Sequence, residues 1–320
     1  MEKEIMVNPS QKNLFVKRQI LKDKFKQLKL KLLWLISRIT TTWADEEKKE
    51  LTSAVREFKQ FVFRDPDTGI HLNYNLYLPK KDLDGACHPL VVFIHDMSIV
   101  GKDPILALIQ GSGGVIWATR AEQAKHPCFV LVPQYSKVIV NDESQATQEL
   151  DVTVNLIKDL FNKYPIDRNK VYTTGQSMGC MASIEMLIRY PDLFSAALLV
   201  AGQWDAIKMS VLKDANMWVV VSEGDRKAFP GMNASMALLE ESGAKISRGI
   251  WNGQSSQEEF CIEVQKMITE GNHIYYTVLK KGTVVPGNLP DDGHNNHMQT
   301  WPIVYQIKAL RDWLFTQRKN

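Results

Sequence analysis

The sequence has few cysteines, and none of them belongs to a short paired motif. The four are widely separated along the 320 residues, at Cys87, Cys128, Cys180 and Cys261. No Cys-x-x-Cys pair occurs and no histidine lies at metal-ligand spacing, so neither a disulfide framework nor a zinc site is predicted. We expect free thiols, with Cys180 packing in a helix rather than reacting.

The chain also lacks a long apolar run and a large excess of one charge. Its 39 basic and 36 acidic residues leave a net charge of +3, which is too balanced to predict a nucleic-acid partner. The first 43 residues are basic, and their longest apolar run spans only residues 32–36. That run is too short for a membrane-spanning helix or for the core of a signal peptide.

We predict a basic amphipathic helical extension over residues 1–50 and one large domain over residues 51–320. The extension can pack on the domain or on a partner, and residues 1–43 can also lie on an anionic membrane surface. We expect a cytoplasmic protein. Secretion is the alternative, because Thr42-Trp43-Ala44 is similar to a leader cleavage site. The oligomeric state is left open.

Beyond residue 57 the sequence alternates between strand-like and helix-like segments. Two alternating runs around a turn-rich loop, near residues 61–63 and 70–78, predict a β-hairpin. Further strands are predicted at residues 90–94, 129–132, 171–174, 194–200, 217–221 and 273–279. Helices are predicted at residues 144–164, 180–190, 232–241, 258–268 and 302–315. Apolar strands that alternate with helices predict an α/β fold with a mostly parallel sheet covered on both faces.

The most informative segment is Val171-Tyr172-Thr173-Thr174-Gly175-Gln176-Ser177-Met178-Gly179. A strand-like run leads into Gly-x-Ser-x-Gly and then into a helical pattern, which is the layout of a nucleophile elbow. The two glycines are needed because side chains at those positions would collide with the neighbouring strand or helix. We therefore predict that Ser177 is a nucleophile. The alternative is an ordinary turn with a helix N-cap serine.

A serine nucleophile needs a base to accept its proton. In the chain order serine, acid, histidine, the candidates are His273, His294 and His297. His273 begins a predicted strand, so we expect it to be structural. We favour His297 over His294, because it lies in a polar loop just before the last predicted helix, whose first turn can hold it. Two surface histidines are the alternative.

A third group must orient the base and fix its tautomer. The loop after the strand predicted at residues 217–221 contains two carboxylates, Glu223 and Asp225. We predict that Asp225 is the acid and keep Glu223 as the competitor. A helix N-cap or turn role is the alternative for Asp225.

Backbone donors are expected for the oxyanion that forms during attack on a carbonyl. One is the N–H group of Met178, directly after the serine. The other comes from the loop after the strand at residues 90–94, where we favour Met97 over Asp96. A backbone donor tolerates any side chain, so the sequence does not choose between these two.

Taken together, these segments resemble the α/β-hydrolase superfamily. Within it, they resemble the bacterial esterase group related to polyhydroxybutyrate depolymerases, often described as predicted peptidases. The resemblance runs from about Leu72 to the end of the chain. It is carried by NLYLP at residues 75–79, PLVVFIH at 89–95, GSGGVIWA at 111–118, FVLVPQY at 129–135 and DRNKVYTTGQSMG at 167–179.

This resemblance implies that residues 51–320 are an α/β-hydrolase catalytic domain. It implies hydrolysis of small-molecule carboxylic esters through an acyl-enzyme, with Ser177, His297 and Asp225 as the triad and with no cofactor or metal. A peptidase that uses the same triad is one alternative. A catalytically silent binding module on the same fold is the other.

The sequence departs from the wider superfamily in two places. It has His95-Asp96 where a His-Gly pair is usual, which affects the expected oxyanion loop. It has Lys227 three residues after Gly224, where an acid is usual, so the carboxylate at Asp225 lies two positions early.

Two features are candidates for lining a substrate pocket. They are the segment at residues 111–118 and the side chain of Trp204. The alternative is a packed loop and an ordinary core tryptophan.

Overall fold

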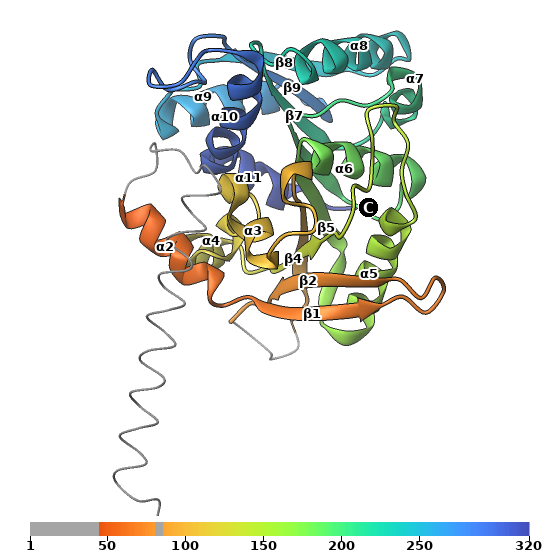
Figure 1. The fold of residues 1–320 in the computed structure, drawn as a ribbon. Helices are drawn as coiled ribbons and strands as arrows, with labels where there is room; N and C mark the ends of the chain where they lie inside the picture. Colours follow the sequence, from red (N-terminus) through yellow and green to blue (C-terminus); the bar gives the residue numbers. More distant parts are fainter. Residues whose placement is uncertain (1–44, 81–85, 320) are drawn as a thin grey trace, which may run out of the picture.

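A computed structural model describes residues 45–80 and 86–319 of the chain. Within these residues a nine-stranded sheet runs through the molecule, with helices on both sides (Figure 1). Most of the predicted extension at residues 1–50, including residues 1–43, lies outside the described residues. In the part that is described, no helix is long and apolar enough to cross a membrane.

The sheet is mostly parallel, as predicted. Its strands are β1 (Lys59–Arg64), β2 (His71–Tyr77), β3 (His88–Ile94), β4 (Phe129–Gln134), β5 (Ile166–Gln176), β6 (Ala196–Val200), β7 (Met217–Ser222), β8 (Ile246–Trp251) and β9 (Ile274–Leu279). They lie in the order β1-β2-β4-β3-β5-β6-β7-β9-β8. β2 pairs antiparallel with β1 and with β4, and all other neighbours pair in parallel.

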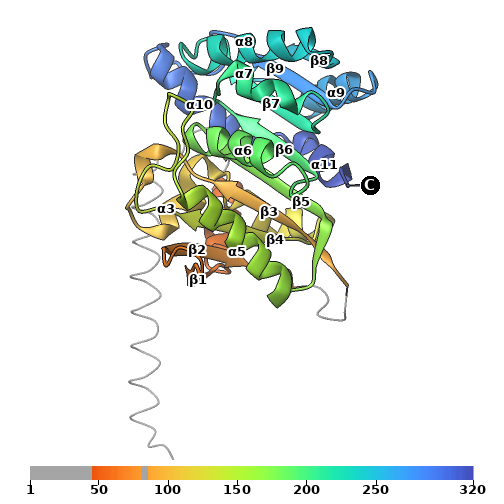
Figure 2. The same ribbon diagram turned by 90° about the vertical axis from the view of Figure 1, so that its right-hand side faces the viewer.

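Helices cover the two faces of this sheet. They are α2 (Asp45–Val55), α3 (Pro104–Ile109), α4 (Arg120–Lys125), α5 (Glu149–Lys163), α6 (Met178–Arg189), α7 (Ala206–Met209), α8 (Ala228–Glu241), α9 (Gln257–Ile268), α10 (Gly293–Gln306) and α11 (Lys308–Thr316). The described part of the chain also contains the short 3₁₀ turns η1 (Met97–Ile99), η2 (Gln110–Ser112), η3 (Ile116–Ala118) and η4 (Ser210–Leu212). α2, α3, α9, α10 and α11 pack on one face, and α5 to α8 pack on the other (Figures 1 and 2).

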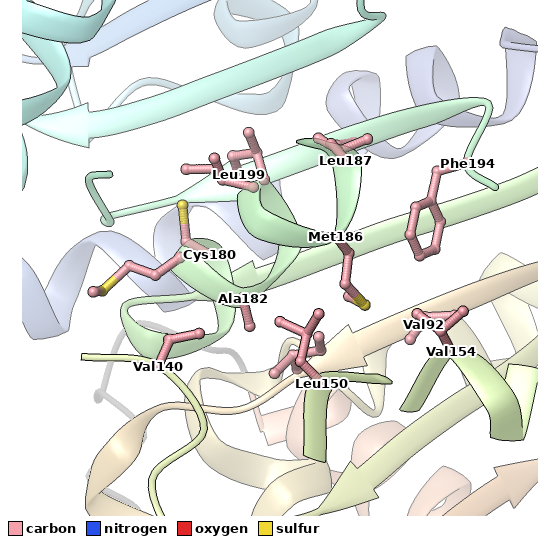
Figure 3. Close-up of a cluster of buried hydrophobic side chains, with 14 of the residues drawn as sticks. Val92, Val140, Leu150, Val154, Cys180, Ala182, Met186, Leu187, Phe194 and Leu199 are labelled. Atoms are coloured by element: carbon pink, nitrogen blue, oxygen red, sulfur yellow. The ribbon is translucent and has the colours of Figure 1, made fainter. Parts of the chain in front are cut away.

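Two hydrophobic cores form because successive side chains of a strand point to opposite faces. In β3, Val91 and Phe93 belong to the core under α3 and α10, whereas Val92 belongs to the core under α5 and α6. Figure 3 shows Val92 gathered with Val154 of α5 and Met186 of α6 in this second core. A strand buried on both faces must be apolar throughout, which explains its continuous hydrophobic run.

The predicted hairpin is confirmed, since β1 and β2 pair with Phe63 opposite Leu72. The turn between them is closed by Asp65, whose Oδ2 accepts a hydrogen bond from the N–H of Thr68 at 3.1 Å. Gly69 completes the turn with a φ of 70°, a left-handed conformation that suits glycine.

The predicted bounds of two helices are wrong. α5 begins at Glu149 rather than near residue 144, because Ser144 has a φ of 55° and lies in a turn. The segment predicted as a single helix at residues 302–315 is two helices, and α10 already begins at Gly293. Pro302 lies inside α10 rather than at its start. The buried neighbours of Pro302 in α10 hold the helix against the core despite the missing N–H group.

Strand β8 was not predicted. It forms an edge of the sheet and pairs only with β9. Its sequence, Ile-Ser-Arg-Gly-Ile-Trp, includes a glycine and an exposed arginine, so it lacks the continuous apolar pattern of the central strands. The predicted boundary between residues 50 and 51 falls inside α2, and Leu51 and Val55 of that helix are buried in the core.

One buried ion pair ties α11 to α4. Arg311 Nε lies 2.8 Å from Glu122 Oε2, and both side chains are less than a tenth exposed. Arg311 also donates a hydrogen bond to the carbonyl oxygen of Tyr305. A buried charge that loses its partner is strongly destabilising, whereas two apolar residues can replace such a pair at little cost.

Removing one partner of this pair should therefore cost far more than removing both. We expect Arg311→Met to lower the free energy of unfolding by about 3–5 kcal/mol, and the double variant with Glu122→Leu to recover most of that loss. Urea unfolding measures both. The control is Arg248→Met, which breaks the exposed pair with Glu240 and should cost about 1 kcal/mol or less. An Arg311→Met loss no larger than that of the control would contradict the argument.

Candidate active site

Ser177 lies on a strained turn between β5 and α6. Its φ of 54° and ψ of −118° are unusual for a residue with a side chain. The turn is possible because the flanking residues are glycines, which have no Cβ to collide with the neighbouring backbone. A Cβ on Gly179 would lie 1.9 Å from the carbonyl oxygen of Ile94, and one on Gly175 would lie 2.4 Å from the carbonyl carbon of Gly179. This is the geometry expected of a nucleophile elbow.

The structure brings Ser177, His297 and Asp225 into one chain of hydrogen bonds. His297 Nε2 lies 2.9 Å from Ser177 Oγ, and His297 Nδ1 lies 2.6 Å from Asp225 Oδ2. With Nδ1 donating to the carboxylate, Nε2 is free to accept the serine proton. The three side chains follow β5, β7 and β9 in the chain, so they meet at the carboxyl ends of parallel strands.

Asp225 is held as a carboxylate by its surroundings. It is only 2 % exposed, and its Oδ1 accepts hydrogen bonds from the N–H groups of Lys227 and Ala228, both at 2.9 Å. Burial alone would raise the pKa of this carboxyl, but the hydrogen bond and charge of His297 and the two backbone donors outweigh it. The net effect is a pKa of Asp225 below the ordinary value.

The competing candidates have other partners or other positions. Glu223 Oε2 accepts a hydrogen bond from the N–H of Lys281 at 2.9 Å. His273 Nδ1 lies 2.9 Å from Asn216 Oδ1. His294 is exposed and lines the cleft described below, whereas the imidazole that hydrogen-bonds Ser177 is that of His297.

The region predicted as a polar loop around His297 is instead the first part of α10. Asp292 caps this helix, and its Oδ1 accepts a hydrogen bond from the N–H of Asn295 at 2.8 Å. His297 therefore projects from the second turn of a helix and not from a loop. Trp301, one turn further along, packs edge-on against the imidazole with ring centroids 5.4 Å apart.

The loop after β3 is organised by Asp96 and Gln110. The Asp96 side chain accepts a hydrogen bond from the N–H of Ser98 at 2.7 Å, which caps η1. The Asp96 N–H donates to Gln110 Oε1 at 3.1 Å, and Gln110 Nε2 donates back to Asp96 Oδ1 at the same distance. Because the Asp96 amide is engaged in this way, Met97 is the better candidate for the second oxyanion donor. Nothing in the sequence pointed to Gln110.

The buried side chain of His95 stabilises the same loop after β3. It is fully buried, its Nδ1 donates to the carbonyl oxygen of Asp96 at 2.8 Å, and its Nε2 accepts from the N–H of Tyr135 at 3.3 Å. Burial lowers the pKa of His95 to about 4, so the ring is neutral at physiological pH. Asp96, which stands where a glycine is usual, thus shapes the loop through its own hydrogen bonds and through the contact with His95.

A cleft of about 640 Å³ opens over Ser177 and His297. Its apolar wall is formed by Met97, Val138, Val140, Met178 and Met181. The remaining wall is polar and includes Asn141, Asp142, Glu143, Gln203, Arg226, Lys227, Asp292 and His294. The predicted Met178 and Met97 therefore both lie beside the serine, whereas most of the other lining residues were not foreseen.

The two predicted pocket-lining features do not line this cleft. The segment at residues 111–118 is buried in the core, and a Cβ on Gly113 would lie 2.3 Å from the ring of Phe93. Trp204 is also buried, and its Nε1 donates to Glu185 Oε2 at 3.1 Å. Packing explains both, so the expectation that they form the pocket was wrong.

An ion pair joins two of the residues that line the cleft. Lys227 Nζ contacts Asp142 Oδ2, and Gln203 Nε2 reaches the other oxygen of Asp142 at 3.4 Å. Both charged side chains remain more than half exposed. Lys227, at the position where an acid is usual, thus joins the loop after β7 to the loop after β4.

The cysteines are free thiols, as expected, and all four lie in the described residues. Cys180 is fully buried, and burial raises the pKa of its thiol. Within residues 45–80 and 86–319, no group of three histidine, cysteine or acidic side chains could hold a metal ion.

No protein-family model matches the chain. Acetylxylan esterase A of Aspergillus awamori is 33% identical over 95 residues, which cover 29% of this chain and 31% of that protein. A solved thermostable esterase is 27% identical, with a TM-score of 0.68, and the match covers 83% of this chain and 64% of that one. The Pyrococcus horikoshii acylaminoacyl peptidase is 12% identical, with a TM-score of 0.53, over 82% of this chain and 42% of that one.

These matches differ in what they show. The chain spans less than two thirds of the length of the two esterases, and the likeness to the peptidase is a likeness of fold alone. The chain has the α/β-hydrolase fold, and its sequence is similar to esterases of that fold.

Proposed function

We propose that this protein is a serine hydrolase that cleaves carboxylic esters through an acyl-enzyme intermediate. The observation that carries the proposal is the continuous hydrogen-bond chain from Asp225 through His297 to Ser177, on an elbow that holds the serine in a strained conformation. Such strain persists only where the surrounding structure enforces it, and a binding role would not require it. The similarity to esterases agrees with this reading.

Each residue then has one task. Ser177 Oγ attacks the acyl carbon while His297 Nε2 accepts its proton, and the N–H groups of Met178 and Met97 donate to the resulting oxyanion. The intermediate collapses to the acyl-enzyme as His297 passes the proton to the leaving alcohol. Water then attacks the acyl carbon by the same route, the acid leaves, and Ser177 regains its proton.

The proposed ligand is a small-molecule ester whose acyl part contacts the apolar wall of the cleft. Methionine and valine side chains form that wall beside the serine, and charged side chains are among the other residues that line the cleft. A peptidase using the same residues remains the alternative. It would require the amine leaving group to take its proton from His297, so an amide analogue belongs in the same assay.

Turnover of p-nitrophenyl acetate and butyrate, with the matching p-nitroanilides as amides, tests the proposed activity. We expect ester turnover by the wild type, and kcat lower by about 10⁴-fold or more in Ser177→Ala, His297→Ala and Asp225→Asn. His294→Ala and Glu223→Gln should remain near wild type. A fluorophosphonate probe should label wild type but not Ser177→Ala.

Other results would lead to other conclusions. A folded wild type that neither turns over esters nor reacts with the probe would reject the hydrolase and favour a silent binding module. Anilide turnover comparable to ester turnover would favour the peptidase. Full activity in His297→Ala with loss in His294→Ala would reject the assigned base.

The stability of the fold should depend on pH through Asp225. The pKa of Asp225 is lower in the folded protein than its unfolded value of about 3.9, so ionised Asp225 stabilises the fold above that pH. The contribution is lost as the pH falls below about 4 through the folded pKa. We expect the difference in unfolding free energy between wild type and Asp225→Asn to shrink as the pH falls below about 4. Urea unfolding measures it, with Glu223→Gln as control. A difference that grows as the pH falls below about 4 would contradict the assignment.

We also propose a cytoplasmic protein whose residues 1–43 contact anionic membrane. Four free thiols suit a reducing compartment, and the sequence of residues 1–43 is basic and amphipathic. The full chain should bind vesicles containing phosphatidylserine at low salt, release at high salt, and lose binding when residues 1–43 are deleted. Equal binding to neutral vesicles, or none at low salt, would reject the membrane contact.

A further inference from the structure

Behind the triad, one buried side-chain hydrogen bond joins the loop that carries Asp225 to the helix that carries His297. Ser222, the last residue of β7, donates from its Oγ to Asn296 Oδ1 at 2.8 Å. Ser222 is fully buried and Asn296 is 1% exposed. These two residues lie three positions before Asp225 and one position before His297.

Every polar atom of the Asn296 side chain is engaged. Its Nδ2 donates to Asp291 Oδ1 at 2.6 Å and to the carbonyl oxygen of Asp292 at 2.9 Å. Asn296 thereby binds both the start of α10 and the end of β7. A buried amide with all its partners in place has one orientation, because any rotation would leave a polar group unpaired.

The loop after β7 is shaped around the same contact. The N–H of Gly224 donates to Ser222 Oγ at 3.2 Å, and the N–H of Asp225 donates to the carbonyl oxygen of Ser222 at 3.0 Å. A Cβ on Gly224 would lie 2.2 Å from Asn296 Cγ. The glycine therefore allows α10 to approach the strand end closely enough for the acid and the base to meet.

We propose that Asn296 and Ser222 are positioning residues that fix the register of α10 on β7, and so hold His297 at hydrogen-bond distance from Asp225. The inference rests on the proposed function, because it assigns these residues to the same triad. Two apolar side chains would bind α10 to β7 without choosing a register. The directional Ser222–Asn296 bond selects the one register in which the imidazole meets both the carboxylate and Ser177.

The test uses Ser222→Ala and Asn296→Ala in the full chain. Small misplacements of catalytic groups are costly, so we expect kcat for p-nitrophenyl butyrate to fall by roughly 10- to 100-fold in each, with KM little changed. The rate of fluorophosphonate labelling of Ser177 should fall by a similar factor. The double variant should be no slower than the worse single variant, because both remove one interaction.

A matched control comes from β8, at an edge of the sheet. Ser247 of β8 is fully buried and accepts a hydrogen bond from Asn272 Nδ2 at 3.1 Å, so Ser247→Ala removes a similar serine–asparagine contact outside the site. It should lower the melting temperature while leaving kcat unchanged. Ser222→Thr keeps the hydroxyl and should recover most of the kcat lost in Ser222→Ala.

A readout that needs no substrate separates this inference from the proposed function. The proton shared by His297 Nδ1 and Asp225 should give a downfield proton resonance in wild type and in Ser247→Ala, and that resonance should weaken or vanish in Ser222→Ala. A wild type that shows the resonance but hydrolyses no ester would reject the esterase and leave the positioning intact. If Ser222→Ala keeps the resonance, kcat and labelling rate, and loses only thermal stability as Ser247→Ala does, the positioning role is overturned.

Discussion

The site depends on one close contact, where helix α6 touches strand β3. Gly179 lies so near the carbonyl oxygen of Ile94 that no side chain fits between them. This contact forces the tight turn that strains Ser177 and turns its side chain away from the sheet. It also sets the first amide of α6, that of Met178, beside the loop that carries Met97. The nucleophile and both proposed oxyanion donors are therefore placed by the same packing.

The rest of the triad is assembled by the sheet and then adjusted by side chains. Parallel strands bring their carboxyl ends to one edge, which is how Ser177 meets a histidine 120 residues later in the chain. Strand pairing fixes where each strand ends, but the loops that carry the catalytic side chains can still vary in conformation. The hydrogen bond between Ser222 and Asn296 restricts this freedom, because it joins the end of β7 directly to the start of α10. A dyad bond as short as 2.6 Å between His297 and Asp225 requires this kind of local support.

The sequence predicted the features that depend on local pattern and missed those that depend on distant contacts. The hairpin, the parallel sheet and the elbow follow from hydrophobic period and glycine spacing, and these are local. The predicted start of α10 was wrong because proline is common at the first position of a helix, which favoured Pro302. The capping by Asp292 leaves no strong pattern in this polar stretch. Gln110 had no signal, since its role is set by a partner fourteen residues away. The form of the segment at residues 111–118 is set by core packing and not by substrate contact.

The acid lies at Asp225 rather than at position 227, and this changes which side chains line the cleft. With the carboxylate at Asp225, its backbone donors are Lys227 and Ala228, and the side chain of Lys227 is free to reach across to Asp142. An acid at position 227 would instead place two carboxylates, with Asp142, on facing loops. Both side chains of this ion pair line the cleft and are more than half exposed, so the pair contributes only about 0–1 kcal/mol. The Ser222–Asn296 hydrogen bond behind the triad is buried instead, so the catalytic geometry depends on that bond rather than on the exposed ion pair.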